Sequence, residues 1–281
     1  MKQQSESRVH QRFLRHSKKF PNVWCAGCGI GIVLGAIIRA VDTLELDKND
    51  VAMISGIGCT GRMPVYVDFN TMHTTHGRAL AFATGLKMVK PKMRVIVVMG
   101  DGDALAIGGN HFIHAARRNI GLTAIVVNNS AYGMTGGQHS PTTPWGIETA
   151  TTPYGHIEQQ FPIAELAATA GASFVARSTV YHVRELERYL EQAITRDGFA
   201  LVEAISYCHT TLGRINRWGT ASDMMRQIKE KSVTLAQVEK MSPDEKQNKI
   251  VRGVFADRDT PEYTQLYDQI IERAQQGQAN D

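Results

Sequence analysis

The segment from Arg94 to Asn129 constrains the fold of this chain more than any other. An apolar run at 94–99 predicts a strand, a Gly-Asp-Gly turn at 100–102 opens a helix that runs to about Arg118, and an apolar run at 122–127 predicts a second strand. This order predicts one βαβ unit. In an open parallel sheet, ligands bind at the carboxyl ends of the strands, and a glycine-rich helix start leaves backbone N–H groups free for phosphate. The unit therefore predicts a site for a phosphorylated cofactor.

Polar side chains follow both strands of this unit. Asp101 follows the first strand and Asn129 follows the second, so we expect the two side chains to lie next to each other. Carboxylate and amide oxygens are hard donors of the kind that octahedral Mg²⁺ accepts beside diphosphate oxygens. A Gly-Asp-Gly turn alone is common and could be an ordinary turn. Its spacing, the flanking strands and the Asn128-Asn129 pair together favour a metal site.

The rest of the pattern predicts an α/β domain with an open, mostly parallel sheet flanked by helices. Further strands are expected at 51–55, 173–176 and 200–205, and further helices at 32–44, 78–89, 163–170 and 183–196.

Three segments are expected along the chain. Residues 1–22 form an N-terminal arm, either solvated or gripping a partner, in which 8–15 could form a short helix. Residues 23–209 form the α/β domain. Residues 210–281 form a polar, helical tail that packs on the domain or on another subunit, with a partly disordered end as the alternative.

Length and charge exclude several classes of protein. A chain of 281 residues can bury a sizeable core. Its formal charge of +4 is too small and too evenly spread to favour nucleic-acid binding, and at most favours acidic substrates or an acidic partner. No apolar run reaches the roughly 18 residues of a membrane span, and the start lacks the hydrophobic segment of a signal peptide. We therefore expect a cytoplasmic protein without a membrane segment.

The chain contains four cysteines, which are Cys25, Cys28, Cys59 and Cys208. A reducing cytoplasm disfavours disulfides, and four is the number of thiolates that a [4Fe–4S] cluster requires. The Cys-x-x-Cys pair on a glycine-rich turn occurs in zinc sites, redox disulfides and iron–sulfur sites alike. Cys59 and Cys208 each follow a predicted strand, so all four thiols are expected at one sheet edge. The alternative for Cys59 is a small buried hydrophobic residue.

Other polar residues are candidates for cofactor or substrate contacts. His73 and His76 precede the helix at 78–89, where the alternative is capping and loop hydrogen bonding. Arg62 could pair with a second substrate carboxylate, or be an ordinary surface arginine. The glycine-rich segment 130–138 is suited to wrapping a diphosphate with backbone N–H groups, and Met134 could line the same pocket. The loop that follows it, through residue 155, is expected to cover the site or face a partner.

These motifs, in this order, resemble those of a known family. Gly100-Asp101-Gly102 followed by Asn128-Asn129 resembles the diphosphate-binding motif of thiamine diphosphate (ThDP) enzymes. With Trp-Cys-x-Gly-Cys-Gly, Gly-Ile-Gly-Cys, His-Thr-x-His-Gly-Arg, Gly-x-Thr-Gly-Gly-Gln and a late cysteine, the set closely resembles the β subunit of 2-oxoacid:ferredoxin oxidoreductases over residues 23–215. The form around 73–78 is most similar to the 2-oxoglutarate branch, also called 2-oxoglutarate synthase.

The resemblance implies which residues hold the cofactors. Asp101, Asn129 and the carbonyl of Ala131 would hold Mg²⁺, and the four cysteines would hold one [4Fe–4S] cluster. The residues expected around ThDP are Ile57, Gly58, His76, Gly100, Asp101, Gly102, Asp103, Asn129, Ala131, Tyr132, Met134 and Thr135. Those expected near the substrate are Arg62, His73 and Met134. Many relatives have a Pro-Cys segment where this chain has Tyr207-Cys208-His209, which puts the fourth cluster ligand in question.

The implied reaction converts 2-oxoglutarate, coenzyme A and oxidised ferredoxin into succinyl-CoA, CO₂ and reduced ferredoxin. It could also run in the reductive direction, as in a reductive citric acid cycle. A cluster near ThDP would accept the electrons one at a time. No pyrimidine-binding domain fits in this chain, so we expect an α subunit to supply the activating glutamate and much of the substrate and coenzyme A contacts, in a heterodimer or an (αβ)₂ assembly.

Three alternatives stay open from the sequence. The substrate could be pyruvate or a branched-chain 2-oxoacid. The protein could be a non-redox ThDP decarboxylase or carboligase with incidental cysteines. It could also be a zinc-stabilised binding module in which Cys25 and Cys28 are structural.

Overall fold

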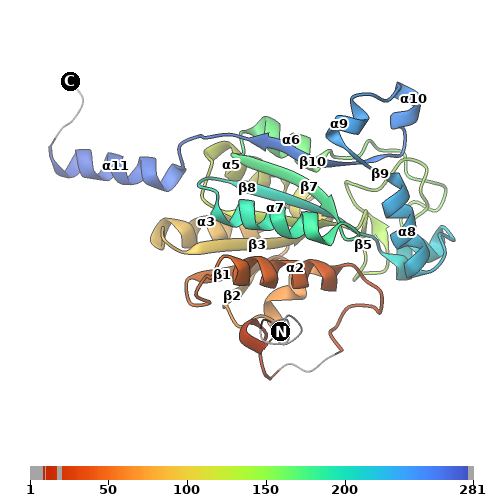
Figure 1. Ribbon diagram of the computed structural model, residues 1–281, viewed down its shortest axis with the longest axis horizontal. Helices are drawn as coiled ribbons and strands as arrows, with labels where there is room; N and C mark the ends of the chain where they lie inside the picture. Colours follow the sequence, from red (N-terminus) through yellow and green to blue (C-terminus); the bar gives the residue numbers. More distant parts are fainter. Residues whose placement is uncertain (1–8, 10, 18–20, 278–281) are drawn as a thin grey trace.

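The protein is built around one eight-stranded sheet with helices on both faces (Figure 1). The computed structural model describes residues 9, 11–17 and 21–277. The strand order is β2-β1-β3-β4-β8-β7-β10-β9, and the first six strands in that order run parallel. The open, mostly parallel α/β architecture expected from the sequence is therefore confirmed.

The strands of the main sheet are β1 (Val51–Ser55), β2 (Asn70–His73), β3 (Arg94–Gly100), β4 (Thr123–Asn128), β7 (Phe174–Thr179), β8 (Ala200–Ile205), β9 (Ser232–Thr234) and β10 (Ile250–Asp257). A separate two-stranded ribbon consists of β5 (Ala131–Tyr132) and β6 (Gln138–His139).

The helices are α2 (Ile30–Thr43), the 3₁₀ helix η1 (Thr60–Val65), α3 (Ala79–Val89), α4 (Asp101–Leu105), α5 (Gly109–Arg118), α6 (Ile163–Ala170), α7 (Val183–Thr195), the π-helix η2 (His209–Gly213), α8 (Ala221–Lys231), α9 (Leu235–Val238), α10 (Pro243–Lys246) and α11 (Tyr263–Gln275). Within the described residues, none of these helices has the length and apolar character needed to cross a membrane.

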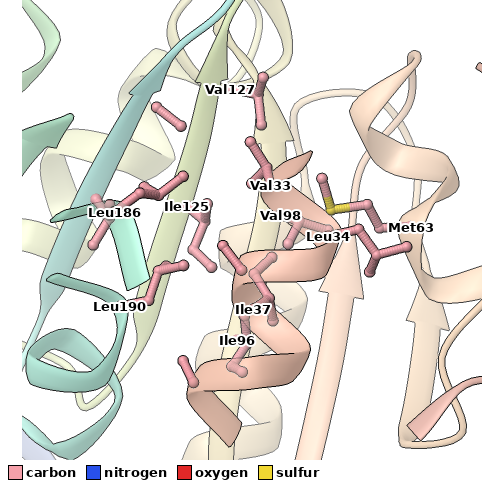
Figure 2. Packing of buried hydrophobic residues seen from close by; sticks show 14 of the residues in the cluster. Val33, Leu34, Ile37, Met63, Ile96, Val98, Ile125, Val127, Leu186 and Leu190 are labelled. Atoms are coloured by element: carbon pink, nitrogen blue, oxygen red, sulfur yellow. The ribbon is translucent and has the colours of Figure 1, made fainter. Parts of the chain in front are cut away.

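Apolar strands supply a hydrophobic layer on each face of the sheet. Ile96 and Val98 of β3 pack in one layer with Ile37 of α2 and with residues of α7 (Figure 2). Val95 and Val97 belong to the opposite layer, beneath α3, α5 and α6. Because successive side chains of a strand point to opposite faces, a strand covered on both faces needs an unbroken apolar run. The run at 94–99 meets this requirement and forms one of the central strands.

The central unit holds two short helices between β3 and β4, so the prediction of a single helix to about Arg118 is wrong. Helix α4 ends at Leu105 and α5 begins at Gly109. Glycine is a poor helix former. A Cβ atom at Gly108 would lie only 2.3 Å from the carbonyl oxygen of Asp103. The chain therefore turns closely at a position where glycine is required, and the helix is interrupted there.

The tail is not purely helical, which corrects a second expectation. Strand β10 joins the sheet antiparallel to β7, and β9 pairs with β10. The charged run before β10 and the Arg252-Gly253 pair within it obscured its apolar pattern. After β10, helix α11 extends away from the body of the domain (Figure 1). At the opposite edge, β2 is a short, polar strand that the sequence pattern did not predict.

The described part of the N-terminal arm is packed on the domain. Phe13 is fully buried against Phe69, with ring centroids 5.7 Å apart. Leu14 forms a β-bridge with Val67, and Arg15 Nε donates a 2.8 Å hydrogen bond to the carbonyl oxygen of Val67. A helical turn covers 11–13, but residues 1–8, 10 and 18–20 of the expected arm lie outside the described residues.

Replacing Phe13 with alanine tests this anchoring. We expect Phe13→Ala to lower the free energy of unfolding by about 3–5 kcal/mol, because it leaves a cavity beside Phe69. Chemical denaturation followed by circular dichroism measures the change. Tyr154→Ala, at a fully exposed position, is the control and should change stability by less than about 0.5 kcal/mol. Equal stabilities of the two variants would contradict the packing described here.

Candidate cofactor site

A cavity of about 190 Å³ opens at the carboxyl ends of β1, β3 and β4. It is lined by Ile57, Gly58, Cys59, Thr60, His76, Gly100, Asp101, Gly102, Asp103, Asn129, Ala131, Tyr132, Gly133, Met134 and Thr135. Every residue that the family resemblance implies around ThDP is in this set. The parallel sheet brings them together because neighbouring parallel strands end at the same edge.

Asp101 and Asn129 lie next to each other in this cavity, with oxygen atoms left free. Asp101 is only 2% exposed, and its Oδ2 accepts hydrogen bonds from the hydroxyls of Ser140 (2.5 Å) and Thr142 (2.6 Å). Its Oδ1 has one longer contact, 3.5 Å from the backbone amide of Asn129. Asn129 Oδ1 is buried and has no hydrogen-bond partner among the described residues. Burial raises the pKa of Asp101, although the two hydroxyls act in the opposite direction.

The turn after β4 places Ala131 in the lining of the same cavity. Asn128 Oδ1 accepts a 3.1 Å hydrogen bond from the backbone amide of Ser130, which closes a local turn. Ser130 adopts a positive φ of 56°, a conformation uncommon for residues other than glycine. The Thr143 hydroxyl donates to the Ser130 carbonyl oxygen at 2.7 Å and holds this turn in place.

Asp103 organises the loops around the cavity. Its Oδ1 accepts hydrogen bonds from the backbone amide of Gly77 (2.7 Å) and of Ile57 (3.3 Å), and it lies 2.7 Å from His76 Nδ1. The carboxylate therefore joins the loop after β1 to the turn before α3. This contact also fixes which ring nitrogen of His76 faces Asp103, so the other nitrogen is left for a ligand.

Gly102 and Tyr132 are in close contact at the start of α4. A Cβ atom on Gly102 would lie 2.3 Å from the Tyr132 ring, so only glycine fits there. The Tyr132 hydroxyl donates a 3.3 Å hydrogen bond to the Gly102 carbonyl oxygen. Burial raises the pKa of Tyr132, and the neighbouring carboxylates of Asp101 and Asp103 raise it further, so the phenol is neutral at physiological pH.

The four thiols gather beside the cavity. The Thr210 hydroxyl lies 3.5 Å from Cys25 Sγ and 3.8 Å from Cys208 Sγ. Burial is the main reason that the pKa of Cys28 is raised to about 11, and the charges of the other three cysteines act on it in the same direction. The pKa of Cys59 is likewise raised to about 11. The four side chains thus form one cluster, although they come from three distant segments.

Gly133 separates the cavity from this thiol cluster. A Cβ atom at Gly133 would lie 3.2 Å from Cys208 Sγ and 3.6 Å from Cys59 Sγ. Gly133 and Cys59 also line the cavity. The two sites therefore share a wall made of a glycine backbone and a cysteine side chain.

Two candidates for substrate contacts lie outside the cavity lining. His73 is exposed on β2, with Nδ1 2.8 Å from Ser55 Oγ. Arg62 is half-buried in η1. Met134, the third candidate, does line the cavity and is half exposed. In the part of the chain that the structure describes, no group of three or more His, Cys, Asp or Glu side chains is close enough to hold a single metal ion.

Sequence reasoning did not single out the residues that support the site. Ser140 and Thr142 come from a loop for which only a covering or partner-facing role was considered. Glu203 occupies a position in the middle of a buried strand. A charged residue inside the otherwise apolar run at 200–205 is the signal that could have indicated a role.

Comparisons with known proteins agree with this geometry. Residues 56–204 match the family described as thiamine pyrophosphate enzyme, C-terminal TPP binding domain. This stretch includes every residue lining the cavity. The fold and site thus define a ThDP-binding domain.

Relatives that are similar along most of the chain show which group of ThDP-binding proteins it resembles. The 2-oxoglutarate synthase subunit KorB of Methanothermobacter thermautotrophicus is 50% identical over 89% of this chain and 87% of its own length. That of Archaeoglobus fulgidus is 54% identical over 76% of this chain and 78% of its own. A solved structure of 2-oxoglutarate:ferredoxin oxidoreductase from Magnetococcus marinus, with 2-oxoglutarate, coenzyme A and succinyl-CoA bound, is 32% identical, with a TM-score of 0.84 over 95% of this chain and 90% of that one.

The chain belongs to the β-subunit family of the ThDP-dependent 2-oxoacid:ferredoxin oxidoreductases. The resemblance to its 2-oxoglutarate branch, drawn from the motifs, is confirmed.

Replacing Gly56 with alanine tests how Asp103 supports the cavity. A Cβ atom there would lie 2.0–2.6 Å from the Asp103 carboxylate, so the carboxylate must move away from His76 and Gly77. We expect Gly56→Ala to weaken ThDP binding by about tenfold or more, as loss of supporting contacts typically does. Titration of the assembled enzyme with ThDP, followed by tryptophan fluorescence, measures the affinity.

Gly85→Ala is the matched control. Gly85 lies in α3, exposed, and a Cβ atom there would meet nothing within 4 Å. This variant should keep ThDP affinity and gain roughly 0.5–1 kcal/mol in stability. If Gly56→Ala bound ThDP as tightly as Gly85→Ala, the organising role of Asp103 would be refuted.

Proposed function

We propose that this chain is the β subunit of a 2-oxoglutarate:ferredoxin oxidoreductase and that it holds ThDP through Mg²⁺ together with one [4Fe–4S] cluster. The observation that supports this most directly is the shared wall at Gly133, with the proposed metal ligands on one side and the thiol cluster on the other. An organic cofactor that releases an electron pair needs a one-electron acceptor close by, and the shared wall would keep the two close together.

The side chains around Asp101 fit a magnesium ion. Asn129 Oδ1 is a buried acceptor without a donor among the described residues. An unsatisfied buried acceptor destabilises the folded protein by about 1–3 kcal/mol unless a ligand supplies a partner. Asp101 is buried with one carboxylate oxygen saturated by hydroxyls and the other nearly free. A divalent cation would satisfy both oxygens and stabilise the charged carboxylate. Asp101, Asn129 and the Ala131 carbonyl are the residues that would hold it.

The four thiols fit an iron–sulfur cluster. Each iron of a [4Fe–4S] cluster takes one thiolate, so the ligands surround a space and do not converge on one ion. The contacts of the thiols support this proposal, since Cys25 and Cys208 both lie near the Thr210 hydroxyl and Cys59 and Cys208 both lie near Gly133. Thr211 Oγ1, 2.8 Å from Cys208 Sγ, would donate a hydrogen bond to the thiolate.

The reaction follows from what these residues would hold in place. When bound, ThDP supplies the carbanion chemistry that removes CO₂ from a 2-oxoacid, and the cluster supplies single-electron transfer. Asp101 and Asn129 would hold the metal that ThDP binding requires. His76, fixed by Asp103, presents its free ring nitrogen to the cavity, where it can hold or donate a proton at the bound ligand. Gly133 allows the sulfur atoms to approach the cavity without an intervening side chain.

The proposal also includes the protein partners of this chain and its location in the cell. An α subunit would supply the activating glutamate and complete the substrate and coenzyme A site, ferredoxin would receive the electrons, and the assembly would be an (αβ)₂ complex in the cytoplasm. The choice of 2-oxoglutarate over pyruvate is supported by the names of the most similar relatives. Arg62 and His73 stay predictions as substrate contacts.

A substrate panel tests the proposed reaction. The chain, co-expressed with its α subunit and purified without oxygen, should be brown, carry about four irons per β chain and reduce a viologen dye when 2-oxoglutarate and coenzyme A are added. Pyruvate and branched-chain 2-oxoacids should be poorer substrates. Decarboxylation of 2-oxoglutarate without dye reduction would favour the non-redox alternative, and zinc in place of iron would favour the binding module.

Removing Cys208 tests the ligand at which the motif departs from many relatives. Cys208→Ala should lose the visible absorbance and most of the iron, to the same extent as Cys25→Ala, because each iron needs its own thiolate. Iron analysis and visible spectroscopy of the complex measure this. Full retention of iron in Cys208→Ala would assign the fourth ligand elsewhere, and retention of a metal only in variants that keep Cys25 and Cys28 would indicate zinc.

A further inference from the structure

A buried ion pair lies behind the proposed metal ligands. Glu203 of β8 is 1% exposed, and its Oε2 accepts a 2.6 Å hydrogen bond from Arg177 Nε of β7. Arg177 also donates to Glu165 at 2.7 Å and stacks on the Phe255 ring, with its guanidinium carbon 4.6 Å from the ring centroid. Burial lowers the pKa of Arg177, but Glu203 and Glu165 outweigh it and hold the pKa above its usual value. The Arg177 guanidinium therefore stays charged beside Glu203.

The ion pair sets the orientation of Asn128. Glu203 Oε1 accepts a 2.9 Å hydrogen bond from Asn128 Nδ2. A carboxylate cannot donate, so it selects the amide nitrogen and turns the amide oxygen the other way. Asn128 Oδ1 then meets the backbone amide of Ser130 and the Thr142 hydroxyl, at 3.1 and 3.0 Å.

Both of these contacts lead to atoms of the proposed metal site. The Ser130 turn precedes Ala131, whose carbonyl is a proposed ligand. Thr142 lies 2.6 Å from Asp101 Oδ2 and helps to leave Asp101 Oδ1 available. The hydrogen-bonded path thus runs from Arg177 through Glu203 and Asn128 to the turn before Ala131. Thr142 connects Asn128 to Asp101 more weakly, because its one hydroxyl hydrogen is shared between Asp101 Oδ2 and Asn128 Oδ1. All of these residues are buried or half-buried.

We propose that Glu203, held by Arg177, is a positioning residue that fixes the Asn128 amide and thereby preorganises Asp101 and Ala131 for a divalent cation. This inference rests on the proposed Mg²⁺–ThDP function. Buried ion pairs are often no more stable than apolar replacements, so stability alone does not account for a charged pair between these buried strands. Residues that support metal ligands typically contribute 10–100-fold to metal affinity.

The chain offers a matched control for this pair. Glu187 of α7 is 8% exposed and pairs with Arg39 of α2 at 2.5 Å, but none of the hydrogen bonds it makes among the described residues leads to the cavity. Glu203→Gln and Glu187→Gln therefore remove one carboxylate charge from comparable environments, and only the first lies on the path to Asp101.

The test measures divalent-cation affinity in the co-expressed α/β complex after removal of metal with a chelator. Free Mn²⁺ followed by electron paramagnetic resonance gives the affinity directly, and ThDP retention as a function of Mg²⁺ concentration gives a second value. We expect Glu203→Gln to weaken cation binding about 10–100-fold, while Glu187→Gln binds as the wild type does. Asn128→Ala removes the amide between Glu203 and Ser130 but leaves the ion pair intact, and it should weaken cation binding to a similar extent. It is the variant that tests the inference if Glu203→Gln does not fold.

Each outcome either supports or overturns the inference. Wild-type affinity in Glu203→Gln or in Asn128→Ala overturns it. Equal weakening in Glu203→Gln and Glu187→Gln also overturns it, because the effect would then be general destabilisation, which the melting temperatures of the two variants would show. Asp101→Asn separates this failure from that of the proposed function: if it binds the cation as tightly as the wild type, the metal site itself is misassigned.

Discussion

Parallel pairing of β1, β3, β4 and β8 is the constraint on which the rest of the structure depends. Because these neighbouring strands run in the same direction, their carboxyl ends meet at one edge of the sheet. Asp101 follows β3, Asn129 follows β4, and Cys59 and Cys208 follow β1 and β8 within a few residues. Groups that lie more than one hundred residues apart in the sequence are thereby brought to one place, and the turn carrying Cys25 and Cys28 packs against them.

Buried carboxylates have separate tasks within this edge. Asp101 presents one nearly free oxygen to the cavity, whereas Asp103 uses an oxygen to join three backbone and side-chain donors. Glu203 acts from further inside, on the amide of Asn128. In each case a carboxylate that is costly to bury is retained where it can accept several hydrogen bonds at once. Asp101 and Asp103 are only two residues apart, but Asp101 is bonded to hydroxyls and Asp103 to backbone amides and a histidine ring.

The sequence predicted the βαβ unit, with Asp101 and Asn129 at its strand ends, because these depend on local patterns. The resemblance of the motifs to a known family implied most of the other residues that line the cavity. Apolar runs specify buried strands, and the position of a polar residue just after a strand specifies the sheet edge. Ser140 and Thr142 could not be found in this way, because their contacts with Asp101 join segments far apart in the chain. For Glu203 the charge inside an apolar run was a signal, but its partners Asn128 and Arg177 could not be identified from it. The break at Gly108 and strand β10 were missed for a related reason. The first depends on the close approach of the Asp103 carbonyl, and the second on pairing with β7, neither of which appears in a periodicity.

The glycine at position 133 has a consequence for how the protein responds to oxidation. Gly133, in the loop that lines the cofactor cavity, lies close to the sulfur atoms of Cys59 and Cys208, and it has no side chain that would separate the loop from them. Oxidation that displaces those sulfurs would also shift Gly133 and with it the lining of the cofactor cavity. Exposure to oxygen would then weaken the binding of ThDP as well as modify the thiols, so the two sites would fail together.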